Sequence, residues 1–109
     1  MMGLNDLPKQ IYNLQLKRLN KINLNSKIKI DLKIQQDNIK YTITLNKQFS
    51  NNLSREIEFN KIINNDKHIL MLINEIDLNN YDINKLTYKI QYYQNILLTL
   101  NHLDMEVSE

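Results

Sequence analysis

The alternation of polar and apolar residues between positions 27 and 47 is the most regular pattern in the chain. Residues 27–34 read Lys-Ile-Lys-Ile-Asp-Leu-Lys-Ile, and the alternation resumes over residues 39–47 after a short segment. A period of two, rich in Ile and Thr, is typical of strands that bury one face. The pattern therefore predicts a β-hairpin with strands at 27–34 and 39–47, and with its apolar side chains on one face.

Spacings of three and four residues predict helices near both ends of the chain. Over residues 6–23, apolar residues recur on one side, with Asp6 as the cap and Pro8 in the first turn. Over residues 82–103 the same spacing follows Asp82, which is a second candidate cap. We expect a helix over each of these ranges.

Two central segments are less regular. Leu53, Ile57, Phe59 and Ile63 occupy odd positions, which predicts a third strand over residues 54–62. Residues 67–78 fit either a helix capped by Asn65 or Asp66 or a buried strand, because their apolar run suits both. The strand is favoured because it completes a meander before the last helix. We expect one α+β domain: an N-terminal helix, an antiparallel meander of three or four strands and a long C-terminal helix.

Composition changes how single residues are interpreted. The 109 residues include 18 Asn, 16 Ile and 12 Lys, but no Ala or Cys and only one Gly and one Pro. This bias is typical of an AT-rich genome, such as that of a bacterium, its phage or plasmid, or a protist, so each Lys or Asn carries less functional meaning. The absence of cysteine favours a reducing compartment, and we expect a cytoplasmic protein. The longest apolar run, residues 69–73, is far shorter than the roughly 18 residues of a membrane span, so we expect no membrane partner.

Residues that could carry catalysis or bind a cofactor are few. A single glycine excludes the glycine-rich loops that bind phosphate. His68 and His102 each lie two residues from an aspartate, but no cysteine or third histidine completes a zinc site. We interpret both as polar residues beside apolar runs. Glu56 and Glu58 would share the exposed side of the third strand and are interpreted as solvated residues rather than a catalytic pair. We therefore expect no enzyme activity, metal or cofactor.

Charge is unevenly distributed along the sequence. Residues 9–55 hold ten Lys and Arg against two acidic residues, whereas residues 68–109 hold two Lys against six acidic residues. The expected hairpin would concentrate this positive charge on its outer face, at Lys27, Lys29, Lys33 and Lys40.

In the expected register Lys33 faces Lys40, and directly opposed like charges are destabilising. A bound anion, either nucleic-acid phosphate or an acidic protein surface, would offset the repulsion. The alternative is a solvated face whose lysines protect the sheet from edge pairing. No aromatic residue falls on this outer face, which argues against the base stacking that single-stranded nucleic acid requires.

The second half of the last helix is apolar over more than one stripe. Ile96, Leu98 and Leu103 lie outside the apolar stripe that a single sheet could cover. This additional apolar surface predicts self-association and a homodimer. The leading functional hypothesis is a non-catalytic protein-binding module: an adaptor, an assembly factor or a small inhibitor of a larger machine. The alternative is a nucleic-acid-binding protein that uses the basic N-terminal helix and hairpin for phosphate contacts.

Overall fold

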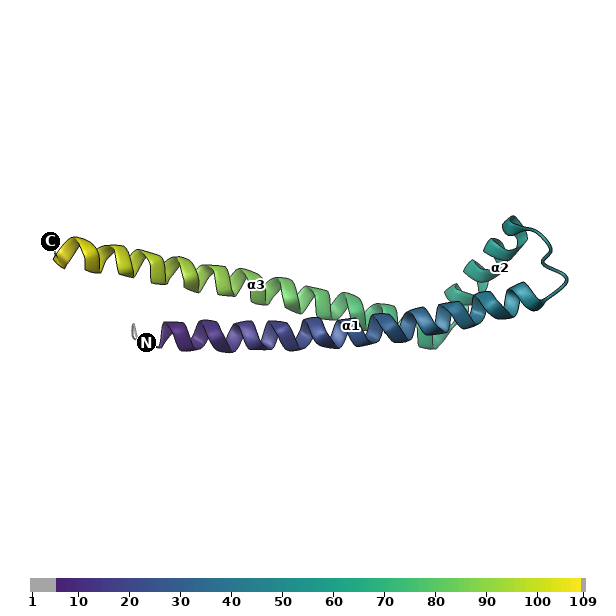
Figure 1. The fold of residues 1–109 in the computed structure, drawn as a ribbon, viewed down its shortest axis with the longest axis horizontal. Helices are drawn as coiled ribbons and strands as arrows, with labels where there is room; N and C mark the ends of the chain where they lie inside the picture. Colours follow the sequence, from purple (N-terminus) through teal and green to yellow (C-terminus); the bar gives the residue numbers. More distant parts are fainter. Residues whose placement is uncertain (1–5, 109) are drawn as a thin grey trace. The chain divides into compact units, whose positions relative to one another are not determined.

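The chain folds into three α-helices. The computed structural model describes the backbone of residues 6–108 and the side chains of residues 6–103. Helix α1 spans Leu7–Leu45, α2 spans Asn52–Asn65 and α3 spans Lys67–Ser108, with no strand among the described residues (Figure 1). The fold is therefore all-α, and the expected α+β domain with a strand meander is wrong.

Residues 27–45 of the alternating segment lie within α1, and on a helix residues two apart fall on opposite sides. Ile28 is buried and Leu32 packs against the same core, whereas Ile30 and Ile34 are 61% and 52% exposed. The chain has no proline after Pro8 to end the helix, and the expected turn lacks the glycine that tight hairpins favour. The pattern thus produces a helix with two apolar sides.

The other two segments expected to be strands are also helical. Residues 54–62 lie within α2, where the odd-numbered apolar residues split between two helix faces. Residues 67–78 lie within α3, where Ile69, Leu72 and Ile76 are buried at helical spacing. The strand favoured there is wrong. Helices α1 and α3 include the segments expected to be helical and extend well beyond them.

Capping hydrogen bonds mark the boundaries of α2. The Asn51 Oδ1 accepts a hydrogen bond of 2.7 Å from the Ser54 amide at the start of the helix. At its end, the Asp66 amide donates to the Ile63 carbonyl at 3.2 Å. The Asp66 carboxylate then accepts from the amides of His68 (2.9 Å) and Ile69 (3.0 Å), which starts α3. One residue therefore closes one helix and opens the next.

The chain divides into two compact units. Unit 1 combines α1 up to Asn23 with α3 from Asn79 onward. Its core consists of three buried residues and the partly buried residues that pack on them. These are Ile11, Leu14 and Ile90, with Leu86, Tyr93 and Leu97. The core positions follow one another at spacings of three and four in each helix, as in an antiparallel coiled coil.

Unit 2 spans residues 24–78 and includes all of α2. Ile28, Leu72 and Ile76 form its core, and Leu32 packs against them. Asn25 is 3% exposed, and its amide donates to the Ile76 carbonyl at 3.2 Å. A buried amide at such a position favours one register of helix pairing at some cost in stability.

Helix α2 has no buried residue of its own. Besides its caps, it is held by a hydrogen bond of 2.8 Å from the Arg55 guanidinium to the Phe49 carbonyl. The Lys40 ammonium of α1 also lies 4.9 Å from the centre of the Phe59 ring. Together with the partly buried Phe59, Ile62 and Ile63, these contacts hold α2 in unit 2.

Ile69 is the most completely buried side chain of the core, at 0% exposure, whereas its neighbour Leu70 is 44% exposed. We expect Ile69→Ala to lower the free energy of unfolding by about 2–5 kcal/mol, because it leaves a cavity. Leu70→Ala, the matched control, should cost less than about 1 kcal/mol. Urea unfolding followed by circular dichroism measures both. Equal losses would contradict the burial described for Ile69.

Candidate functional site

The four lysines expected on a hairpin face lie instead on α1, and all four are exposed. Lys29, Lys33 and Lys40 follow at intervals of four and seven residues and so share one side of the helix. Lys27 precedes Lys29 by two residues and lies on the other side. The basic hairpin expected from the sequence does not exist, and Lys33 does not face Lys40.

The three residues expected to drive self-association lie on α3 in unit 1. Ile96 is partly buried, while Leu98 and Leu103 are 59% and 50% exposed. Ile96 and Leu103 are seven residues apart and share a face, whereas Leu98 points to another side of the helix. The structure therefore divides this set between two surfaces.

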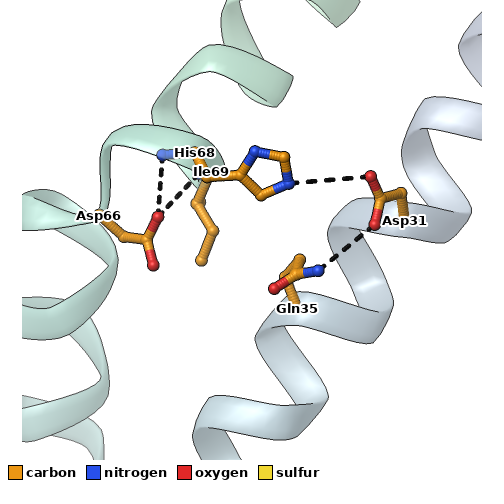
Figure 2. A network of polar contacts seen from close by, with 5 residues as sticks. All are labelled: Asp31, Gln35, Asp66, His68 and Ile69. Atoms are coloured by element: carbon orange, nitrogen blue, oxygen red, sulfur yellow. Dashed lines mark hydrogen bonds and ion pairs between the residues drawn. The ribbon is translucent and has the colours of Figure 1, made fainter.

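His68 belongs to a small polar network rather than to a pair with Asp66 (Figure 2). The Asp66 carboxylate is occupied by the backbone amides that it caps. The His68 ring turns toward α1, where its Nε2 lies 3.9 Å from a carboxylate oxygen of Asp31. Gln35 donates to the same carboxylate at 3.5 Å. The side chains of His68 and Asp31 are both about half exposed, so their contact contributes little to stability.

The other acidic and histidine side chains are dispersed. Glu56 and Glu58 lie on different faces of α2, not together on one side of a strand, because residues two apart diverge on a helix. His102 is exposed on α3, and the side chain of its expected partner Asp104 lies outside the described residues. Within the described part of the chain, no group of three or more His, Asp or Glu side chains is placed to hold a metal ion.

A cluster of basic residues in unit 1 is the feature that the sequence did not predict. Lys17 and Lys21 of α1 line a groove with Lys85 and Lys89 of α3; Asp82 and Leu86 complete the lining.

Two contacts show how the helices bring these residues together. The Lys21 ammonium lies 3.4 Å from the Asp82 carboxylate, and Arg18 donates to the Thr87 hydroxyl at 3.4 Å. The two segments therefore run antiparallel. Because charge was counted along the sequence, Lys85 and Lys89 were assigned to an acidic region. Their proximity to Lys17 and Lys21 was therefore missed. The signal available was that each helix carries two lysines at i and i+4, on one face.

An exposed apolar stripe runs along α1 in unit 2. Its members are spaced by four, seven and four residues, so they share one side of the helix. They are Ile30, Ile34, Tyr41 and Leu45, which are 61%, 52%, 67% and 65% exposed. We call this set the α1 stripe. It lies away from the buried side of the helix, which holds Ile28 and Ile43.

Comparison with known proteins gives no match: no family model, curated protein or solved structure is significantly similar to this chain. Among the described residues, no helix combines the length and the apolar character needed to cross a membrane.

The network around His68 leads to a test of whether Asp66 or Asp31 contributes more to the free energy of unfolding. Asp66→Ala should lower the free energy of unfolding by about 1 kcal/mol, because the first amides of α3 lose their cap. Asp66→Asn should restore most of this loss, since asparagine caps equally well. Asp31→Ala removes only the half-exposed contact with His68 and the 3.5 Å hydrogen bond from Gln35, and should change stability by less than about 0.5 kcal/mol. Thermal and urea unfolding of the three variants would refute the assignment if Asp31→Ala cost more than Asp66→Ala.

Proposed function

We propose that the protein is a non-catalytic, cytoplasmic protein-binding module that assembles through the outer faces of its helices, with a second copy of itself as the first partner. The observation that supports this is the apolar surface outside the cores. Among the described side chains, nineteen large apolar residues are exposed and nine are buried. Four of the exposed residues share one side of α1 as the α1 stripe, and an apolar surface of this kind is typical of an interaction site.

The spacing of the α1 stripe supports a second copy as the partner. The sequence separations within the stripe are symmetric about the midpoint between Asp37 and Asn38. A twofold interface is self-complementary, so each residue meets its counterpart in both copies. When two α1 helices pack antiparallel about this midpoint, Ile34 meets Tyr41 of the second copy and Ile30 meets Leu45. All four stripe residues of each copy are then covered.

The charges beside the α1 stripe determine how this dimer responds to salt. Lys33, Asp37 and Lys40 lie along one flank of the stripe. In the antiparallel arrangement each Asp37 lies near lysines of the second copy, which offsets part of the repulsion among the four lysines. The net charge of that flank remains positive. Added salt screens the residual repulsion and should therefore strengthen the dimer or leave it unchanged.

A dimer of this kind would leave α3 free for other proteins, as expected of an adaptor, an assembly factor or an inhibitor. Ile96 and Leu103 on one face, and Leu98 on another, are the candidate contacts there. Phosphate binding by the four lysines first expected on a hairpin, Lys27, Lys29, Lys33 and Lys40, is a weaker candidate, because Lys27 lies on a different side of α1 from the other three.

Pairing of Ile34 with Tyr41 in the dimer can be tested by complementary charges. Ile34→Lys and Tyr41→Glu should each yield a monomer, because each buries unpaired charge at two symmetric positions. Mixing the two variants should restore a dimer, because the introduced charges then attract across one contact while Ile34 and Tyr41 meet at the other. Sedimentation equilibrium at about micromolar concentration measures all three samples.

The controls separate this arrangement from other modes of assembly. Leu98→Glu and Leu103→Glu should leave the dimer intact, and circular dichroism should show that every variant remains helical. A wild-type protein that is monomeric at all concentrations would contradict the proposal. Failure of the mixture to dimerise would exclude the antiparallel register, and loss of the dimer only in Leu103→Glu would move the interface to α3.

A further inference from the structure

The groove of unit 1 that is lined by Lys17, Lys21, Lys85 and Lys89, which we call the lysine groove, has an excess of positive charge. Four lysines and one aspartate line it, and Asp82 is engaged with Lys21 at 3.4 Å. Within each helix the two lysines are four residues apart, a spacing at which like charges repel. The antiparallel pairing then places the two lysine pairs in one groove, where their potentials add. Such a groove attracts an anion with more than one negative charge.

Exposed tyrosines lie next to the groove on α3. Tyr81 and Tyr88 are 62% and 71% exposed, the latter the highest value among the large apolar residues. Lys85 lies between them at i+4 and i−3, on the same side of the helix, and also lines the groove. Its ammonium is 5.4 Å from the centre of the Tyr81 ring. The aromatic surface and the basic groove are therefore continuous.

We infer that this face of unit 1 binds single-stranded nucleic acid, with phosphates in the lysine groove and unpaired bases on the rings of Tyr81 and Tyr88. Basic grooves flanked by exposed aromatic rings are the usual means of binding single strands without sequence preference. Two helical turns separate the two tyrosines, about 10 Å along the axis, which leaves room for a separate base on each. An acidic protein would use the lysines but would not require two rings spaced to take separate bases.

The lysines are tested through the salt dependence of binding. The probe is a fluorescein-labelled oligothymidylate, and its anisotropy is followed over a series of salt concentrations. Each phosphate contact contributes about −0.7 to the slope of log K against log salt for a single strand. Lys85→Gln with Lys89→Gln should weaken binding and reduce the slope by about 1.4. The control, Lys47→Gln with Lys61→Gln, removes the same charge from unit 2 and should leave the slope unchanged.

The tyrosines are tested separately, because stacking has little salt dependence. Tyr81→Leu with Tyr88→Leu should lower the affinity by at least about fivefold per ring at every salt concentration and keep the wild-type slope. Tyr81→Phe with Tyr88→Phe retains the rings and should bind nearly as well as the wild type. Tyr12→Leu removes an equally exposed tyrosine from α1, away from the groove, and should have no effect.

Several results would overturn the inference. One is an absence of oligothymidylate binding at low salt. Another is retention of full affinity in the leucine variants while the lysine variants lose it, which would indicate a general polyanion or acidic-protein site. Equal affinity for a duplex would likewise exclude base stacking. The monomeric variant Ile34→Lys should still bind the oligonucleotide, so this site and the α1 dimer can fail independently.

Discussion

Burial of one residue in every three or four along α1 and α3 is the constraint on which both units depend. In unit 1 the buried core residues are Ile11 and Leu14 on α1 and Ile90 on α3. In unit 2 they are Ile28 on α1 and Leu72 and Ile76 on α3. Two-helix packing of this kind offers only a narrow seam, so few side chains are removed from water. Polar residues occupy part of it, as Asn25 does with its hydrogen bond to the Ile76 carbonyl. The remaining apolar side chains must lie outside, which is why so many are exposed.

The sequence predicted the fold best where only one periodicity was present. Residues 6–23 and 82–103 have helical spacing alone, and both segments lie within helices. Residues 27–47 alternate, and that pattern is compatible with a strand that buries one face or with a helix that has two apolar sides. The choice of a strand assumed that Ile30 and Ile34 would not be left in water. The turn expected at residues 35–38 has no glycine, which weakened the choice of a hairpin without excluding it.

The candidate sites were predictable only in part, and for a geometric reason. The lysines of α1 were identified, but their grouping depended on a hairpin register that a helix does not have. Lys85 and Lys89 were assigned to an acidic region because charge was summed along the chain. Their proximity to Lys17 and Lys21 follows from antiparallel packing of segments about 65 residues apart in the sequence, which no local pattern encodes. Tyr81 and Tyr88 could be identified as candidate binding residues only once the structure showed that Lys85, which lies between them on α3, lines the groove.

The attachment of α2 without any buried side chain has a consequence for dynamics. Segments with few buried apolar contacts open locally at a small fraction of the global free energy of unfolding. The amides of residues 52–65 should therefore exchange with solvent faster than those of α1 beside Ile28 or of α3 beside Leu72. Ile43, which lines a groove together with Phe59, becomes accessible whenever α2 detaches. We therefore expect a stability gradient in unit 2, in which the shortest helix opens and recloses more often than the core of Ile28, Leu72 and Ile76 unfolds.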